Sequence, residues 1–242
     1  MLAVLVALLI LMALGACDAR TPAGLGADGG VAPSSVASGT PSSALGSAPP
    51  AANEFAGTVE PIPPAMAAEM TGVSWRPGCP VVLADLRLVR LTYFGFDGVT
   101  HRGELMTHKD VAPAIVRVFR HLYAARFPIR KMVRIDAYGG SDDASMADDN
   151  TSMFNCRKAW GSTKWSVHAY GKAIDVNTVE NPYLPGKQVL PSAGASYVDR
   201  GNVRPGMVVS GDVVVRAFQA EGFRWGGNWK SGTDYQHFET GP

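Results

Sequence analysis

The sequence of 242 residues contains little cysteine, little net charge and no apolar run long enough for a comfortable bilayer span near its start. Its 22 Lys and Arg residues nearly balance its 21 Asp and Glu residues, giving a formal net charge of +1. Nucleic-acid-binding proteins usually carry a strong basic excess, so we expect no nucleic-acid partner. The apolar run from Leu2 to Leu14 is shorter than the roughly 20 residues that span a bilayer.

The N-terminal run is followed by small residues and a cysteine, Leu14-Gly15-Ala16-Cys17. A short apolar run before small residues is typical of a secretion signal. The cysteine at the cut site makes this segment resemble a bacterial lipoprotein signal, in which Cys17 is lipidated and becomes the mature N-terminus. We therefore predict a lipoprotein-type signal peptide over residues 1–17 and a membrane anchor through the lipid on Cys17. The alternative is an ordinary signal peptide or an N-terminal anchor in which Cys17 has no role.

Residues 18–71 are rich in Ala, Pro, Ser and Gly and poor in aromatic and charged side chains. Such a segment buries too little apolar surface to offset its ordering entropy, so we predict a disordered linker. The remainder, 72–242, is long enough for one domain with a genuine core. It contains the other two cysteines, Cys79 and Cys156. In an oxidising compartment these form a candidate disulfide, and the alternative is two buried thiols.

The pattern within 72–242 predicts an α+β fold, a small antiparallel sheet flanked by helices. Strands are expected over 86–96, 103–106, 132–138, 173–177, 223–227 and 235–239. Helices are expected from about residue 110 to 127 and from about 210 to 222, where apolar residues recur at helical spacing. Residues 142–150 are expected to form a polar loop, and residues 181–205 a long connecting segment rich in Pro and Gly. No regular alternation of strand and helix is present, which favours α+β over α/β.

A histidine and an aspartate lie seven positions apart in the segment Ser166-Val167-His168-Ala169-Tyr170-Gly171-Lys172-Ala173-Ile174-Asp175. On a helix they would not be neighbours, because side chains that contact one another there lie three or four positions apart. They converge if the chain turns back, and Gly171 has the conformational freedom for that turn. On a strand, Asp175 points away from its apolar neighbours. A metal ion would be a suitable partner, since burying a bare carboxylate is costly.

A second polar cluster lies near the C-terminus, where Trp225-Gly226-Gly227-Asn228-Trp229 precedes Asp234-Tyr235-Gln236-His237-Phe238-Glu239. Two imidazoles and one carboxylate suit zinc and leave a fourth position for water. Asp234 is a candidate to take and return the proton of that water. This role requires irregular backbone, because on an extended strand Asp234 would face away from His237.

Together these segments resemble the D-alanyl-D-alanine carboxypeptidase family of zinc peptidases, the VanY-like enzymes, which also includes L-alanyl-D-glutamate endopeptidases. The shared pattern is Ser-x-His-x-x-Gly-x-Ala-x-Asp, then Trp-Gly-Gly-x-Trp and Asp-x-x-His-Phe. The resemblance implies an open cleft with Zn²⁺ held by His168, Asp175 and His237, and a catalytic carboxylate at Asp234. Many members have Glu at this last position.

The family usually has an arginine just after the strand that leads into the site, but the corresponding stretch 137–141 has none. Arg157 is our substitute candidate, able to polarise the scissile carbonyl or to bind a carboxylate. The alternative is a structural or surface arginine. Ser166, Tyr170 and Trp229 are candidate substrate-binding residues, since aromatic side chains often line clefts.

The sequence thus predicts an extracytoplasmic enzyme, a membrane-anchored lipoprotein or a protein secreted to the cell wall, that hydrolyses peptidoglycan stem peptides. A D-alanyl-D-alanine carboxypeptidase is the leading hypothesis, and an L-alanyl-D-glutamate endopeptidase is the first alternative. The rival from another class is a non-catalytic wall-binding module that keeps zinc for stability.

Overall fold

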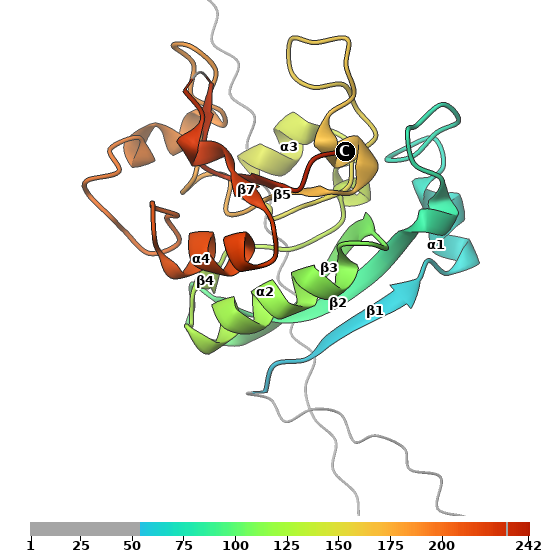
Figure 1. Ribbon diagram of the computed structural model, residues 1–242, viewed down its shortest axis with the longest axis horizontal. Coiled ribbons are helices and arrows are strands. Elements are labelled where there is room, and N and C mark those ends of the chain that lie inside the picture. The colour runs from blue at the N-terminus through green and yellow to red at the C-terminus, as the bar shows by residue number, and fades with distance from the viewer. Residues whose placement is uncertain (1–53, 231) are drawn as a thin grey trace, which may run out of the picture. The chain divides into compact units, whose positions relative to one another are not determined.

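The computed structural model describes residues 54–230 and 232–242, and within these ranges it has a four-stranded, a three-stranded and a two-stranded sheet, mostly antiparallel, with helices packed around them (Figure 1). The predicted α+β class is confirmed. The proposed signal peptide, Cys17 and linker residues 18–53 lie outside the described residues. In the described part of the chain, no helix combines the length and the apolar character needed to cross a membrane.

The larger sheet is built on a long hairpin. Strand β2 (Leu86–Gly95) pairs antiparallel with β1 (Gly57–Pro61) on one side and β3 (Thr100–His108) on the other, and the short β4 (Pro128–Ile129) runs parallel to β2. Helix α2 (Ala112–Ala124) covers one face of this sheet with Ile115, Phe119 and Leu122, all almost fully buried. Helix α4 (Val213–Ala220) packs beside α2 and shares the same core.

The smaller sheet carries the motif residues. Strand β5 (Ala173–Asp175) pairs antiparallel with β9 (His237–Glu239), which pairs on its other edge with β7 (Arg224–Trp225). Strands β6 (Tyr183–Leu184) and β8 (Thr233–Asp234) form a separate two-stranded ladder. Ile174 and Phe238 are fully buried in the core shared with α2 and α4, so this core fixes the position of the small sheet.

The remaining elements are short. They are helices α1 (Pro64–Met70) and α3 (Asp142–Ala147), and the 3₁₀ turns η1 (Leu83–Asp85), η2 (Ile135–Tyr138), η3 (Val167–Tyr170), η4 (Ser192–Tyr197) and η5 (Gly226–Asn228). A disulfide joins Cys79 to Cys156, with 5.9 Å between their Cα atoms, which confirms the predicted pairing.

Three expectations from the sequence are wrong. The predicted linker is ordered from residue 54 onward, where β1 and α1 belong to the domain, because β1 completes the edge of β2 and Glu60 pairs with Arg90. The segment 132–138 is not a strand: its Val133 N–H donates to the Asn150 side chain and the chain then enters η2. The segment 142–150 is not a loop, because Ser141 caps α3 by accepting the Ala144 N–H.

Candidate metal centre and active-site cleft

The turn that carries His168 is built by its two ends. Ser166 accepts the His168 N–H at 3.3 Å and begins η3, and Gly171 ends it with a φ of 66°. A Cβ at Gly171 would lie 2.7 Å from the His108 backbone nitrogen, so this close approach requires glycine as well as the positive φ. The chain therefore turns back at Gly171, as the sequence indicates, and continues into β5.

The β5–β9 pairing places the other two residues opposite each other. Asp175 is the register partner of His237 in this antiparallel pair. Ile174 and Val176 point into the core and are fully buried, so the Asp175 side chain points the other way. The sheet thus holds Asp175 and His237 side by side, and η3 brings His168 to them.

The three side chains converge on one point. The His168 Nε2 atom lies 3.2 Å from Asp175 Oδ2 and 3.2 Å from His237 Nδ1, and His237 Nδ1 lies 3.1 Å from Asp175 Oδ1. Ligand atoms at about 2.0–2.1 Å from a tetrahedral zinc ion are about 3.3 Å apart, so this spacing fits zinc. All three residues are more than 90% buried. Two imidazoles and a carboxylate are also a donor set that zinc favours.

Further hydrogen bonds orient both histidines. His168 donates its Nδ1–H to the Met153 carbonyl, which leaves Nε2 facing the other two donors. The Nε2 atom of His237 lies 3.3 Å from Glu239 Oε2, and the other oxygen of Glu239 accepts from Arg224 at 2.8 Å. Such contacts fix the tautomer and ring orientation of metal-binding histidines. The sequence analysis did not identify Glu239, although its position two residues after His237 on one strand was a usable signal.

The electrostatics of this cluster favour positive charge at its centre. Burial lowers the pKa of His237, but hydrogen bonds to Asp175 and Glu239 and the charges of Asp175 and Asp234 outweigh it and raise the pKa to about 10. Burial would raise the pKa of Asp175, yet the two imidazoles hold it well below its usual range. The same field that stabilises an imidazolium would stabilise a divalent cation held between these groups.

Asp234 lies in the same cleft but outside this ligand set. It ends β8, and two irregular residues separate it from β9, so it is not on one extended strand with His237. Its Oδ1 atom is buried and has no hydrogen-bond partner in the described part of the chain. Burial, with the Asp175 charge adding to it, raises the pKa of Asp234 to about 8. This is a carboxyl group adapted to exchange protons near neutral pH.

The Trp-Gly-Gly motif packs against Asp234. A Cβ on Gly226 would lie 2.7 Å from the Asp234 carbonyl oxygen, so glycine permits η5 to pack against β8. The Trp225 indole donates to the Tyr235 carbonyl at 2.9 Å and is buried in the core. Trp229 is 37% exposed, and its ring centroid lies 5.2 Å from that of His237. One tryptophan therefore supports the site and the other forms its wall.

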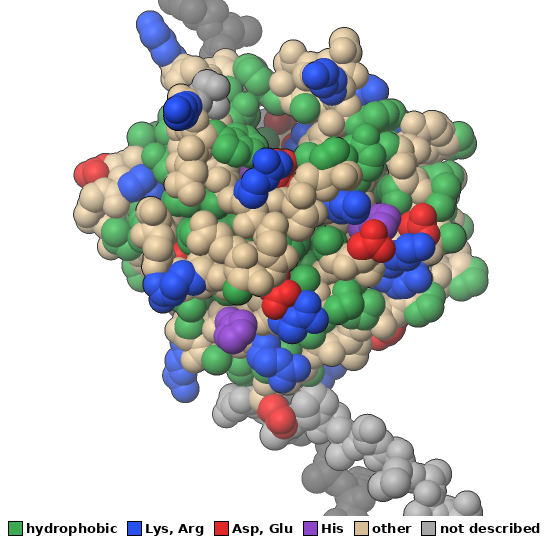
Figure 2. All heavy atoms as spheres, in the orientation of Figure 1, with side chains coloured by type: hydrophobic (Ala, Val, Ile, Leu, Met, Phe, Trp, Pro, Cys, Tyr) green, Lys and Arg blue, Asp and Glu red, His purple; other side chains and the backbone are tan. Residues whose placement is uncertain are grey.

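The cleft has a volume of about 340 Å³ and collects nearly all the predicted site residues. In Figure 1 the arm of residues 157–165 and the turn before β9 rise on the same side of the molecule, and Figure 2 shows the surface hollowed between them. Its lining includes Ser166, His168, Asp175, Trp229, Asp234 and His237, together with Arg157. Tyr170 is half-buried and is not among the lining residues of this cleft, so its substrate contact stays a prediction.

Arg157 reaches the cleft from the arm that follows the disulfide, and it is paired with Asp142 at 2.5 Å. Asp142 belongs to α3, the segment expected to be a loop. Three further lining residues, Lys158, Trp160 and Tyr183, come from the arm and from β6. Sequence reasoning missed Asp142 and these three because their meeting depends on long-range folding rather than on a local motif.

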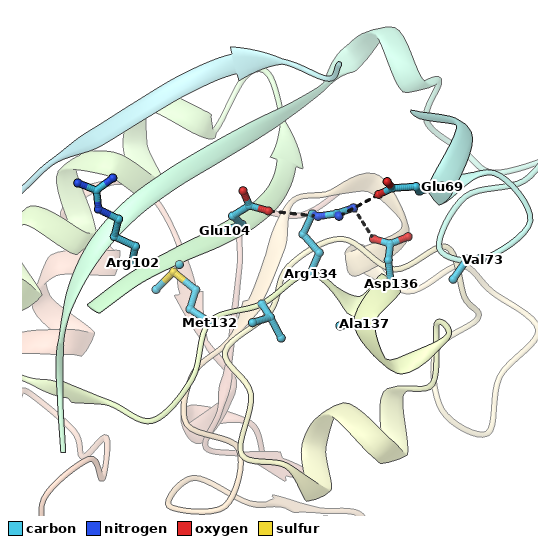
Figure 3. Close-up of a pocket in the computed structure, with 10 residues that line it drawn as sticks. Glu69, Val73, Arg102, Glu104, Met132, Arg134, Asp136 and Ala137 are labelled. Atoms are coloured by element: carbon cyan, nitrogen blue, oxygen red, sulfur yellow. Dashed lines mark hydrogen bonds and ion pairs between the residues drawn. The ribbon is translucent and has the colours of Figure 1, made fainter. Parts of the chain in front are cut away.

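A second hollow, of about 510 Å³, lies beside β3 and η2 (Figure 3). There Arg134 lies between three carboxylates, at 3.3 Å from Glu69, 3.4 Å from Glu104 and 3.3 Å from Asp136. Asp136 also accepts the Ser74 hydroxyl at 2.6 Å. Arg134 and the three carboxylates therefore satisfy one another, and Arg102, which also lines the hollow, has no ion pair in the described part of the chain.

Comparison with known proteins agrees with the motifs. Residues 160–240 match the model of a family described as D-alanyl-D-alanine carboxypeptidase. The matched segment runs from the arm beside Arg157 to the end of β9, and it contains His168, Asp175, Asp234 and His237. No solved structure matches the chain. Peptidases of the matched family depend on zinc and act on peptidoglycan. The resemblance is confirmed, and residues 160–240 carry the signature of the D-alanyl-D-alanine carboxypeptidase family.

Proposed function

We propose that this chain is a zinc-dependent D-alanyl-D-alanine carboxypeptidase that removes the terminal D-alanine from peptidoglycan stem peptides. The observation that carries the proposal is the convergence of His168, Asp175 and His237 in the same cleft as Asp234, whose Oδ1 atom is buried and has no partner in the described chain. A structural zinc site needs its ligands alone, whereas hydrolysis also needs a proton acceptor. The family match supports a peptidase, and the type of peptide bond is the finer part of the proposal.

Zinc bound to this ligand set would act as a Lewis acid and lower the pKa of a coordinated water. His168, Asp175 and His237 would hold the ion, and the Met153 carbonyl and Glu239 keep the two rings in the tautomers that binding requires. The oxygen of the attacking water bonds to the scissile carbonyl carbon, and Asp234 takes one proton from that water. The same carboxyl then gives that proton to the leaving amine as the C–N bond breaks, so Asp234 ends in its initial state.

Arg157 supplies positive charge to the cleft, for the scissile carbonyl or for the carboxylate of the substrate. Trp229 forms an apolar wall beside His237. The alternative activity, cleavage between L-alanine and D-glutamate, uses the same proton acceptor and ligand set, and the matched family description favours the carboxypeptidase.

The deciding experiment incubates the full chain with a stem pentapeptide and with the matching tetrapeptide, with and without a chelator, and identifies products by mass. Loss of one D-alanine from the pentapeptide, abolished by chelation and restored by zinc, is the expected result. Cleavage after L-alanine would assign the endopeptidase instead. Zinc bound at one equivalent with no cleavage of either peptide would favour a wall-binding module.

We also propose export and attachment to the membrane through a lipid on Cys17, with stem peptides reached through the segment that follows. The support is the apolar run over 2–14 that ends in Leu-Gly-Ala-Cys. Cell fractionation and intact mass should show a diacylglycerol-sized addition on Cys17 that Cys17→Ala removes. A secreted chain cut at another residue would replace the lipoprotein with plain secretion.

A further inference from the structure

Asp142 makes contacts that its position in α3 alone does not explain. Its Oδ2 atom lies 2.5 Å from Arg157 Nη2, and its Oδ1 atom accepts the Asn155 side-chain amide at 3.2 Å. Asn155 is 5% exposed, and its amide also donates to the Gly140 carbonyl at 3.2 Å. The start of α3 is thus hydrogen-bonded to the segment that carries Arg157.

That segment is itself firmly held. The Asn155 N–H donates to the His168 carbonyl at 3.2 Å, and the Cys156 N–H donates to the Ser74 carbonyl at 3.0 Å. The disulfide to Cys79 is a second link that fixes Cys156. The backbone before Arg157 is therefore tied to the turn that supplies His168, and the position of the guanidinium depends mainly on its own rotamers.

The guanidinium retains a free donor. Nη2 pairs with Asp142, and Nη1 donates to the Lys158 carbonyl at 3.3 Å. The Nε atom is buried and has no partner in the described part of the chain. Arg157 lines the cleft with Asp234 and His237, so the side chain that carries this donor lies in the same cleft as the predicted reacting groups. A buried donor without a partner costs free energy unless a ligand satisfies it.

We propose that Asp142 is a positioning residue that fixes Arg157, so that the guanidinium binds an anionic oxygen of the substrate in the cleft. The inference rests on the proposed function. The anionic oxygen has two sources with the same chemistry: the terminal carboxylate of the peptide, and the oxyanion that develops on the scissile carbonyl. Asp142 lies outside the segment that matches the family, so this contact goes beyond the matched motifs.

Without Asp142 the arginine side chain regains rotamer freedom, and its charge is no longer directed at one place in the cleft. The Asp142→Asn variant keeps the size of the side chain and its bond to Asn155 but loses the charge. The Asp142→Glu variant keeps the charge and should restore part of the activity. Asp199 is the control, because it is exposed, does not line the cleft and has no ion pair in the described chain. Asp199→Asn removes the same charge at a distance from Arg157.

The test measures kcat and KM of the full chain on a pentapeptide ending in D-alanyl-D-alanine and on its C-terminal amide. If Arg157 binds the terminal carboxylate, Asp142→Asn should raise KM for the acid about tenfold and leave KM for the amide unchanged. If it binds the oxyanion, kcat should fall about tenfold on both peptides. In an Arg157→Ala background, Asp142→Asn should add no further loss, because positioning acts only through Arg157.

Zinc content and Tm must match those of the wild type, and Asp199→Asn should change KM no more than about twofold. Values of kcat and KM within twofold of wild type for Asp142→Asn on both peptides would overturn the inference. An equal loss in the Arg157→Ala background would overturn it as well.

Peptide affinity separates this inference from the proposed reaction. Calorimetry on the zinc-loaded chain measures Kd for the acid and the amide without requiring turnover. If no peptide is cleaved but Asp142→Asn weakens binding of the acid about tenfold, the inference stands and the proposed hydrolysis fails. If neither peptide is cleaved or bound, both fail.

Discussion

The cleft around His237 and the hollow around Arg134 both place carboxylates near a cation, but they differ in whether their buried polar atoms have hydrogen-bond or ion-pair partners. In the hollow, Arg134 meets three carboxylates and Asp136 also bonds Ser74. In the cleft, buried polar atoms of Arg157, Asp234 and Gln236 have no partner in the described chain. The two are of comparable size, so neither size nor charge density distinguishes the site. Unpaired buried atoms do distinguish the two, because three of the six in the described chain line the cleft and none lines the hollow, and such atoms cost free energy that a ligand or a reaction recovers.

The strongest way to break this comparison is to remove the proton acceptor. Asp234→Asn keeps the shape of the side chain but cannot take a proton, so kcat should fall by about 10²–10⁴. Zinc content by atomic absorption should stay at one equivalent, because Asp234 is outside the ligand set. If kcat stays within tenfold of wild type, Asp234 is not the proton acceptor and the unpaired atom has another explanation.

Glu239 tests the contacts that hold the metal ligands. Glu239→Gln weakens the hydrogen bond to His237 Nε2 and loses the charge paired with Arg224. Contacts of this type are worth about 10–100-fold in metal affinity, so the zinc Kd should rise by that factor. A competition titration against a chromophoric chelator measures it.

Glu221→Gln is the control for Glu239, because Glu221 pairs with Arg117 on the surface away from the cleft. It should leave the zinc Kd unchanged. Equal zinc affinity for Glu239→Gln and the wild type would show that Glu239 links β9 to Arg224 and does not contribute to metal binding.

Some features of the site could be predicted from the sequence because they are local. The turn at Gly171 places His168 near Asp175, and strand alternation directs Asp175 out of the core. The pairing of Asp175 with His237 follows once β5 and β9 are recognised as neighbours. Glu239 follows from the same alternation. All of these depend on residues within a few positions of a recognisable motif.

Other features depend on distant contacts. Residues 54–71 have the composition of a linker, yet they fold because β2 offers an unpaired edge and Arg90 offers Glu60 a partner. The acidic run at 142–149 resembles a solvated loop, yet Ser141 caps it into a helix, and Asp142 then meets Arg157. Composition averages over a segment and contains no information about the surface that the segment meets.

Three residues with buried unpaired atoms lie outside the cleft, Glu180, Arg200 and Arg204, and Glu180 is the carboxylate among them. Burial and the neighbouring Asp149 raise its pKa to about 8, and Arg130 offsets them only in part. The folded state therefore keeps a proton that the unfolded chain loses above about pH 4.5. Between those pH values the folded state binds more protons, so the unfolding free energy should fall as pH rises and level off above about pH 8.

Glu180→Gln should flatten that dependence, because the amide carries no titrating proton. Urea unfolding at pH 5, 6, 7 and 8 measures it, and the difference between the slopes of variant and wild type isolates Glu180 from the histidines. We expect a difference on the order of 2 kcal/mol across this window. If the unfolding free energies of variant and wild type change with pH in parallel, Glu180 is ionised and paired with Arg130. Its unpaired oxygen would then not indicate a cost in stability.

Arg134 should give the smallest effect. Arg134→Met removes three ion pairs but keeps the apolar part of the side chain, and two of the partners, Glu69 and Glu104, are exposed to solvent. Exposed ion pairs contribute little, so the unfolding free energy should fall by about 1 kcal/mol. Both kcat and KM on the pentapeptide should stay within twofold of wild type, since none of these residues lines the cleft. A tenfold loss of kcat/KM at unchanged stability would connect the hollow to the cleft, and paired charges could then no longer be taken to mark a purely structural site.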